Sequence, residues 1–179
     1  MTIRTTILKN ILLVEDDPRD VELTLAALDE HYLANQIEVV NNGAEALDYL
    51  FRRGKFNNRA AANPILVLLD LKMPKISGLE VLKTIKADAQ LKIIPVVVLS
   101  SSCETPDLVQ CYQYGVNAYV VKPVDFGEFV DAVKQLGIFW AAVNEPPPNI
   151  GGVEPSKIPV PEKEDDNDGI PASYPASGG

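Results

Sequence analysis

The sequence has few of the residues that build disulfide frameworks or zinc sites. Its 179 residues include two cysteines and one histidine. Cys103 and Cys111 are too few for a disulfide framework, and with a single histidine they offer no zinc-ligand spacing. We therefore expect both cysteines to be small, partly buried residues of a cytoplasmic protein.

Long apolar stretches and positive charge are also scarce. The longest apolar runs, such as residues 65–69 and 95–99, are far shorter than the roughly 20 residues that a membrane helix needs. The N-terminal residues contain no apolar region typical of a signal peptide, because charged residues interrupt them. The formal net charge of −9 leaves no positive field to bind nucleic-acid phosphates. We expect neither a membrane protein nor a nucleic-acid-binding one.

Negative charge and proline are concentrated near the C-terminus. Residues 1–143 carry 18 acidic and 14 basic residues, whereas residues 144–179 carry 7 acidic and 2 basic residues and 8 of the 14 prolines. So polar a segment cannot bury enough apolar surface to offset the entropy lost on ordering. We expect residues 1–143 to form one domain and residues 144–179 to form a tail, largely disordered from residue 149 onward.

Short apolar runs alternate with segments of helical period along the predicted domain. The nearly continuous runs are rich in Val, Ile and Leu, which favours parallel strands covered on both faces. Strict alternation predicts an α/β fold with right-handed crossovers, and five units favour a doubly wound parallel sheet of order 2-1-3-4-5. The expected strands are residues 11–14, 36–40, 65–70, 96–100 and 118–121; the expected helices are residues 18–30, 43–53, 78–87, 105–114 and 125–143.

Polar residues follow four of these predicted strands. They are Glu15, Asp16 and Asp17 after the first strand, Asp70 at the end of the third, Ser100 to Ser102 after the fourth, and Lys122 after the fifth. Ligands of such sheets bind at the carboxyl ends of the strands, near the point where the strand order reverses. We expect these side chains to lie together.

Converging carboxylates repel one another and need a cation to stay ionised. Carboxylate oxygens without imidazole or thiolate partners select Mg²⁺, which also takes phosphate oxygens as ligands. A magnesium site beside a hydroxyl and an ammonium suits a phosphoryl group. Asp70 is the best candidate nucleophile, because carboxylates form acyl phosphates and this one is central. Taken alone, Asp70 could instead be only a helix cap.

Four motifs in order carry a family resemblance. The runs ILLVEDDP, LVLLDLKMPKISG, IPVVVLSSS and NAYVVKPV resemble, in order and spacing, the receiver domain of two-component response regulators, a flavodoxin-like fold. The resemblance covers about residues 8–140. It implies that Asp70 accepts a phosphoryl group from the phosphohistidine of a sensor histidine kinase. We expect His31, the single histidine, to lie at the surface and not to serve as a phosphohistidine donor.

The resemblance also assigns roles to individual residues. Glu15 and Asp16 are the acidic pair, and Asp16, Asp70 and the backbone carbonyl of Lys72 are implied Mg²⁺ ligands. Lys122 and Ser100 contact the phosphoryl group. Ser100 and Tyr119 are the switch pair, Lys72 and Ser102 tune dephosphorylation, and the Lys122–Pro123 bond would be cis. In this reading the chain is a phosphoacceptor and not an enzyme acting on other substrates.

Two other functions stay open. One is a receiver-like binding module that is not phosphorylated. The other is a phosphatase with an aspartyl nucleophile, although such enzymes carry a second Asp two residues after the nucleophile, where this chain has Lys72.

A narrower resemblance concerns the ends of the predicted domain. The segment 51–63 and the run LGIFW, followed by NEPPP, are similar to the small response regulators that partner cyanobacterial and bacterial phytochromes and have no output domain. This implies a phytochrome-type kinase as partner and a homodimer. Phe139, Trp140 and Pro146 are the candidate dimer contacts, and packing of the aromatic residues on their own domain is the alternative.

Overall fold

The computed structural model describes residues 10–29, 37–59 and 62–147. Five parallel strands form one sheet in the order β2-β1-β3-β4-β5. The predicted strand order and fold class are confirmed. The strands are β1 (Ile11–Val14), β2 (Ile37–Val40), β3 (Leu66–Leu69), β4 (Val96–Ser100) and β5 (Ala118–Val121).

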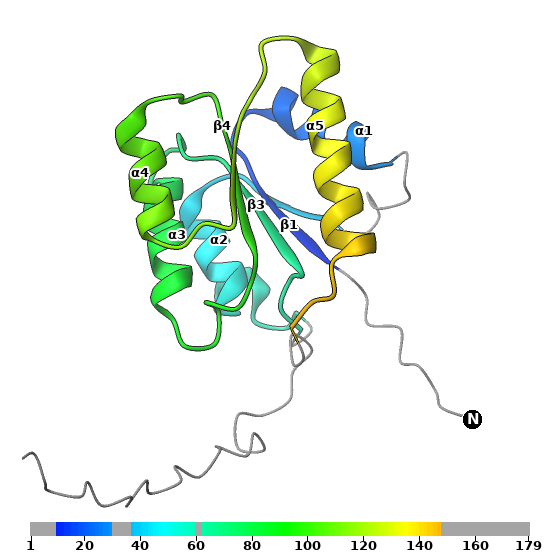
Figure 1. The fold of residues 1–179 in the computed structure, drawn as a ribbon. Coiled ribbons are helices and arrows are strands. Elements are labelled where there is room, and N and C mark those ends of the chain that lie inside the picture. Colours follow the sequence, from blue (N-terminus) through cyan, green and yellow to red (C-terminus); the bar gives the residue numbers. More distant parts are fainter. Residues whose placement is uncertain (1–9, 30–36, 60–61, 148–179) are drawn as a thin grey trace, which may run out of the picture.

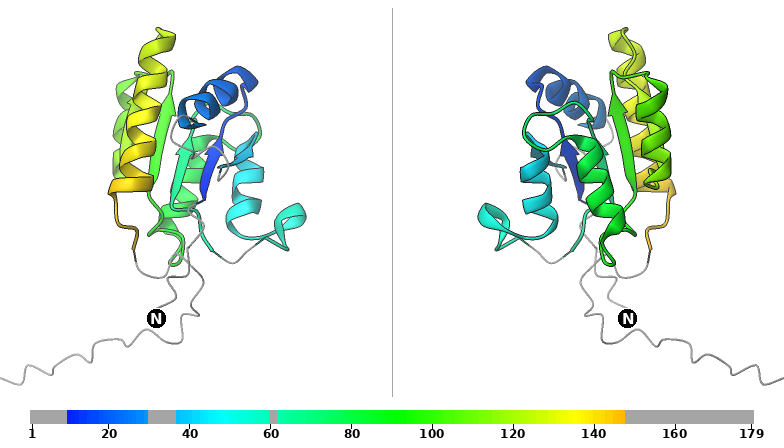
Figure 2. Two further views of the ribbon diagram at one scale, coloured as in Figure 1. Left: turned by 90° about the vertical axis from the view of Figure 1, so that its right-hand side faces the viewer. Right: turned by 90° about the vertical axis from the view of Figure 1, so that its left-hand side faces the viewer.

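Helices cover both faces of this sheet (Figure 1). α1 and α5 lie side by side on one face, and α2, α3 and α4 lie on the other. In Figure 2, α2 and the short helix that follows it lie on the side of the molecule away from α5. The helices are α1 (Pro18–Asp29), α2 (Gly43–Leu50), α3 (Gly78–Ala87), α4 (Thr105–Gln113) and α5 (Phe126–Ile138), with a 3₁₀ turn η2 (Gly54–Phe56) and a π-helical turn η3 (Phe139–Val143).

The core is divided into two layers by the pleat of the sheet. Along β1, Leu12 and Val14 pack toward α2, α3 and α4, while Ile11 and Leu13 pack toward α1 and α5. Every residue of β1, β3 and β4 is buried. The continuous apolar runs therefore reflect burial on both faces, because alternate side chains need an apolar partner on either side.

Several predicted boundaries differ by a few residues. α2 ends at Leu50, because Arg52 has a positive φ of 54° that a helix cannot continue. Its last carbonyls are capped by the Arg59 guanidinium, which donates to the oxygens of Tyr49 and Leu50. The final predicted helix is two elements, α5 and η3. Gln36, Glu30, His31 and the tail from residue 148 lie outside the described residues.

Two smaller expectations are wrong. No peptide bond within the described ranges is cis, so Lys122–Pro123 is trans, which is the preferred isomer by roughly 0.5–1 kcal/mol even before proline. Cys111 is buried but Cys103 is exposed, because Cys103 lies in the loop between β4 and α4 rather than on a packed element.

The sheet brings the predicted residues to one edge through its backbone hydrogen bonds. The Asp70 amide donates to the carbonyl of Val14 at 3.0 Å, which continues the β1–β3 ladder by one residue. The Lys122 amide likewise donates to the carbonyl of Ser100 at 2.8 Å. The polar residues at the ends of β1, β3, β4 and β5 are therefore held by the backbone of the sheet, whose strands β1, β3 and β4 are fully buried.

Candidate functional site at the strand ends

Three carboxylates meet where β1 and β3 end. Glu15, Asp16 and Asp70 each offer an oxygen, and these atoms lie within 4.8 Å of one another. Glu15 and Asp70 are buried, whereas Asp16 is exposed. Such a cluster is open to solvent on the Asp16 side and closed on the protein side.

Lys122 provides the positive charge of this cluster. Its Nζ lies 2.6 Å from Glu15 Oε2 and 2.6 Å from Asp20 Oδ2, but 3.8 Å from Asp70 Oδ1. The lysine side chain is only 11% exposed. The ammonium therefore hydrogen-bonds to Glu15 and Asp20, while Asp70 is within ion-pair distance but beyond hydrogen-bond reach.

Burial dominates the electrostatics of the site. Loss of hydration raises the pKa of Asp70, against lowering contributions from Lys122 and from hydrogen bonds of the Leu71 and Lys72 backbone. Burial likewise raises the pKa of Glu15. Burial lowers the pKa of Lys122, but the hydrogen bonds to Asp20 and Glu15 together with the negative charges of Asp70 and Glu15 outweigh burial, so the pKa of Lys122 is raised and the ammonium stays charged. One lysine thus leaves the buried carboxylates incompletely neutralised.

This donor set fits a hard divalent cation. The three residues offer carboxylate oxygens and no nitrogen or sulfur, the ligand type that Mg²⁺ and Mn²⁺ accept. A cation here would offset the cost of burying Glu15 and Asp70 as anions. Among the described residues this is the one such group of acidic, histidine or cysteine side chains. The ligand role of the Lys72 carbonyl remains a prediction.

The two predicted switch residues are joined through Ser102. Ser100 is fully buried, and its Oγ accepts a hydrogen bond from the Ser102 amide at 3.1 Å. The hydroxyl of Tyr119 donates to the Ser102 carbonyl at 2.8 Å. The loop after β4 therefore contacts both side chains, so a movement of this loop would change the surroundings of each.

The two predicted tuning residues differ in their surroundings. Lys72 is exposed on the loop after β3. Ser102 is buried, and its Oγ donates to Asp107 Oδ2 at 2.7 Å. The Ser102 side chain is thus held by the first turn of α4, whereas the Lys72 side chain extends into solvent.

The candidate dimer contacts lie at the C-terminal end of α5 and beyond it. Phe139 is 48% exposed and stacks edge-on against Trp140 with ring centroids 5.1 Å apart. Trp140 is partly buried against the α1–α5 layer of the core. Pro146 is half-buried. Phe139 is the contact candidate with most free surface, and Trp140 is largely used by its own domain.

Sequence reasoning missed Asp20 and Asp107. Both occupy the first turn of a helix that follows a strand of the site, and both carry a carboxylate back to a strand-end residue. An acid in the first turn of a helix is also favoured by the helix dipole alone, so the sequence signal is ambiguous. Their position at the same sheet edge as the strand-end residues was the available clue.

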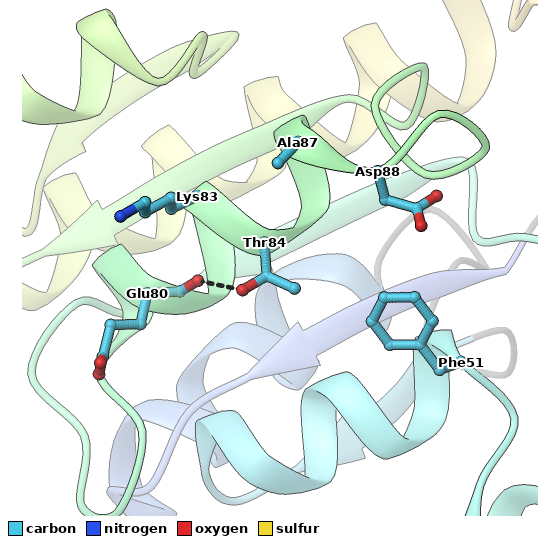
Figure 3. A pocket seen from close by; sticks show the side chains of 6 residues that line it. All are labelled: Phe51, Glu80, Lys83, Thr84, Ala87 and Asp88. Carbon is cyan, nitrogen blue, oxygen red and sulfur yellow. Dashed lines mark hydrogen bonds between the residues drawn. The ribbon is translucent and has the colours of Figure 1, made fainter.

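A shallow hollow of about 540 Å³ lies elsewhere on the surface. Figure 3 shows Phe51 at the end of α2 facing the outer side of α3, where Thr84 donates to the backbone carbonyl of Glu80 at 2.8 Å. Its lining residues are Phe51, Glu80, Lys83, Thr84, Ala87 and Asp88. None of the strand-end residues lines it, so the candidate chemistry is not located in this hollow.

Comparison with known proteins decides what this arrangement is. The model of the response regulator receiver domain matches residues 11–134, more than half of the chain. The chain belongs to this family. Its relatives include the probable methanogenesis regulatory protein FilR2 of Methanothrix harundinacea, 39% identical over 76% of this chain and 86% of that protein. Response regulator Rcp1 of Synechocystis is 36% identical over 74% of this chain and 88% of its own length.

Solved structures of phytochrome-associated response regulators are similar to this receiver domain. The phosphorylated cyanobacterial phytochrome response regulator RcpA is 40% identical, with a TM-score of 0.73 over 78% of this chain and 98% of that one. The bacteriophytochrome response regulator RtBRR is 59% identical, with a TM-score of 0.64 over 79% and 86%. The Mn²⁺-bound form of Rcp1 is 34% identical, with a TM-score of 0.72 over 78% and 99%.

Membership of the family explains why acidic residues gather at this edge of the sheet. Receiver domains are generally phosphoacceptors without catalytic turnover of other substrates, and they bind Mg²⁺ through an acidic cluster such as that of Glu15, Asp16 and Asp70. In the part of the chain that the structure describes, no helix is both long and apolar enough to span a membrane.

Proposed function

We propose that this receiver domain accepts a phosphoryl group on Asp70 from the phosphohistidine of a sensor histidine kinase, in a Mg²⁺-dependent reaction. The observation that carries the proposal is the position of Asp70, 8% exposed in its side chain, which lies within the acidic cluster and 3.8 Å from the Lys122 ammonium. A carboxylate oxygen of Asp70 attacks phosphorus, the new O–P bond forms, and the P–N bond to the kinase histidine breaks. The imidazole leaves with the bonding electrons.

Charge neutralisation and positioning supply most of the catalysis in phosphoryl transfer, so no general base is needed. Mg²⁺ would be held by Glu15, Asp16 and Asp70 with the Lys72 carbonyl, and it would neutralise charge on one phosphoryl oxygen. Lys122 offers its ammonium to another phosphoryl oxygen, and the Ser100 hydroxyl offers a hydrogen bond to a third. These groups come from the ends of β1, β3, β4 and β5, four neighbouring strands of the sheet, so the phosphoryl group would be oriented by several elements at once.

The response is a local rearrangement after β4. When Ser100 turns its hydroxyl to the phosphoryl group, the hydrogen bond to its Oγ from the Ser102 amide is exchanged for one to a charged acceptor. The Tyr119 ring then moves, because its hydroxyl is held by the Ser102 carbonyl. Such a charge event biases two arrangements of one element, and the domain signals by changing its contacts with a partner or with a second copy. Lys72 and Ser102 set how readily water reaches the acyl phosphate.

The decisive experiment is labelling with acetyl phosphate or a phosphorylated histidine kinase, followed by mass mapping. The expected product carries one phosphoryl group at Asp70, and Asp70→Asn gives none. Asp131→Asn, which removes an exposed acid of α5, is the matched control and should be labelled like wild type. An unlabelled wild-type chain would favour the unphosphorylated binding module, and full labelling of Asp70→Asn would place the acceptor elsewhere.

We also infer a phytochrome-type kinase partner, from the similarity to the cyanobacterial phytochrome response regulator RcpA and the bacteriophytochrome response regulator RtBRR. A phosphotransfer panel of kinases, with a phytochrome kinase first, tests this. Transfer from unrelated kinases at equal or higher rates would refute it. The same reasoning supports a cytoplasmic location, where such a kinase presents its phosphohistidine.

A homodimer through the end of α5 completes the proposal. Phe139, exposed beside Trp140, is the apolar anchor, and Pro146 extends the contact in both directions because a two-fold interface is self-complementary. Sedimentation equilibrium should show a dimer that Phe139→Ser weakens. Val109→Ser, on exposed α4 surface, is the control. A monomeric wild type, or equal weakening by both changes, would contradict this interface.

The domain division is part of the same proposal. Residues 1–143 would carry phosphorylation, and residues 144–179 would not be required for it. A chain ending at residue 143 should therefore be labelled at Asp70 at the rate of the full chain. A truncated chain that folds but is not labelled would show that the tail takes part in the reaction.

A further inference from the structure

The Lys122 ammonium has a contact that the proposed reaction does not use. Of its two shortest ion pairs, one is with Glu15 at the end of β1, and the other is with Asp20 in the first turn of α1. Both distances are 2.6 Å, whereas the distance to Asp70 Oδ1 is 3.8 Å. The charge that has to act at Asp70 is thus bound most closely to two other carboxylates.

The donor capacity of lysine makes this arrangement consequential. An ammonium has three N–H donors and no acceptor. Two of them are engaged by Glu15 and Asp20, and both contacts are charge-assisted and short. Glu15 is 5% exposed in its side chain and cannot withdraw from the cluster, whereas Asp20 is 32% exposed and can be rehydrated when its contact breaks. Asp20 is therefore the partner that Lys122 can give up at least cost.

The geometry also shows what this contact achieves at the acceptor. The Lys122 ammonium lies 3.8 Å from Asp70 Oδ1, beyond hydrogen-bond distance, so in the resting chain it does not reach the atoms at which the new bond would form. At the same time the lysine remains within ion-pair distance of the acceptor. Asp20 holds the ammonium close to the reacting atoms without letting it bind them.

We propose that Asp20 is a positioning residue that, together with Glu15, holds the Lys122 ammonium off Asp70 in the resting chain and releases it to the phosphoryl oxygen during transfer. This inference rests on the proposed phosphorylation of Asp70. The Asp20 contact competes with the phosphoryl oxygen for Lys122, so it slows phosphorylation and lowers the yield of acyl phosphate. The Asp20 contact thus stabilises the unphosphorylated state of the domain.

The test compares phosphorylation rates of Asp20→Asn and wild type with acetyl phosphate at saturating Mg²⁺. We expect Asp20→Asn to be labelled about three to five times faster, since a partly exposed ion pair is worth up to about that factor. Asp20→Glu, which keeps the charge, should return the rate toward that of wild type. Glu22→Gln, which removes an exposed charge further along α1, is the control for general electrostatics and should leave the rate unchanged.

A double-mutant cycle shows whether the effect passes through Lys122. In a Lys122→Met background labelling is slow, because a positioned cationic donor is lost, by a factor on the order of 100. Followed over a correspondingly longer time, Asp20→Asn should then have no further effect. An equal acceleration in both backgrounds, or no acceleration in either, would overturn the proposal.

A second readout does not depend on phosphorylation. The ¹⁵N-detected signal of the Lys122 ammonium should be visible in the wild-type chain because two carboxylates slow its exchange with water, and it should broaden in Asp20→Asn. It should broaden less, or not at all, in Glu22→Gln. A signal unaffected by Asp20→Asn would refute the proposed role of Asp20 in holding Lys122. A wild-type chain that gives the expected signals but is not phosphorylated would refute only the proposed function.

Discussion

Gly78 offers the sharpest test of how the fold supports the acceptor. It is the first residue of α3 and is buried directly against the backbone of Asp70 and Leu71. A Cβ at this position would lie 2.7 Å from Leu71 Cα and closer still to the Asp70 carbonyl oxygen. These neighbours are backbone atoms of the strand end, so they cannot turn aside as a side chain would.

The expected effect of Gly78→Ala is a loss of stability. Helix propensity alone would favour alanine by up to about 1 kcal/mol. Overpacking against a fixed backbone costs about 1–3 kcal/mol or more, and strain on the Gly78 amide, which donates to the Leu71 carbonyl at 3.0 Å, adds up to about 1.5 kcal/mol. We expect a net loss of about 3 kcal/mol in the free energy of unfolding, a large part of the roughly 5–15 kcal/mol typical of a domain.

Urea unfolding followed by circular dichroism measures this loss. Gly115→Ala is the matched control: Gly115 has a positive φ of 86° but nothing within 4 Å of its would-be Cβ, so only the backbone conformation is penalised, by about 1–2 kcal/mol. Asp70 should also be phosphorylated more slowly in Gly78→Ala, because the backbone of the acceptor has to shift. Gly115→Ala should be phosphorylated at the rate of wild type. A Gly78→Ala chain as stable as wild type would refute the reasoning.

Three further results are expected. Burial raises the folded-state pKa of Glu15 and Asp70 above their ordinary values of 4.5 and 3.8. In metal-free buffer these two carboxyls should therefore stabilise the folded chain at low pH, and this stabilisation should be lost as the pH rises through their folded-state pKa values. Urea unfolding measured over a range of pH should show that saturating Mg²⁺ reduces this loss more in wild type than in Asp70→Asn. Asn117→Ala removes the oxygen that accepts from the Val96 amide at 2.9 Å and should cost about 1–3 kcal/mol in the same assay, whereas a loss below the error of the measurement would mean that water replaces it. Tyr119→Phe should speed hydrogen exchange in the loop after β4 by about fivefold, since one hydrogen bond is worth about 1 kcal/mol; unchanged exchange would show that the Tyr119 hydroxyl does not restrain this loop.

The features that could be predicted from the sequence are those that depend on apolar runs and on the alternation of strands and helices. Buried parallel strands require continuous apolar runs, and strand order follows from the number of alternating units, so both were predictable. The meeting of Glu15, Asp16 and Asp70 also followed, because residues that end neighbouring parallel strands share one sheet edge. Where prediction extended an element, as for α2 beyond Leu50, the failure came from a positive φ at Arg52 that the sequence did not signal.

The long-range partners were not predictable in the same way. Which acid binds Lys122 depends on how α1 packs on the sheet. Asp20 is one of several acids near the start of that helix, and its side chain reaches Lys122 only once the helix is packed in the folded chain. Asp107 and Ser102 present the same problem across the β4–α4 loop. Sequence spacing brings candidate residues to one end of the molecule, whereas side-chain packing selects among them.

The Lys122 contacts also have a consequence for the order of events in folding. The lysine is 107 residues from Glu15 and 102 residues from Asp20 in sequence, and β3 and β4 lie between β1 and β5 in the sheet. The cation can therefore join the carboxylates only after the last strand has been added, and a nascent or nicked chain that ends before β5 holds the acids without their lysine. Phosphorylation competence would then report that the complete domain has assembled, so that an incompletely folded chain does not compete for the phosphoryl group.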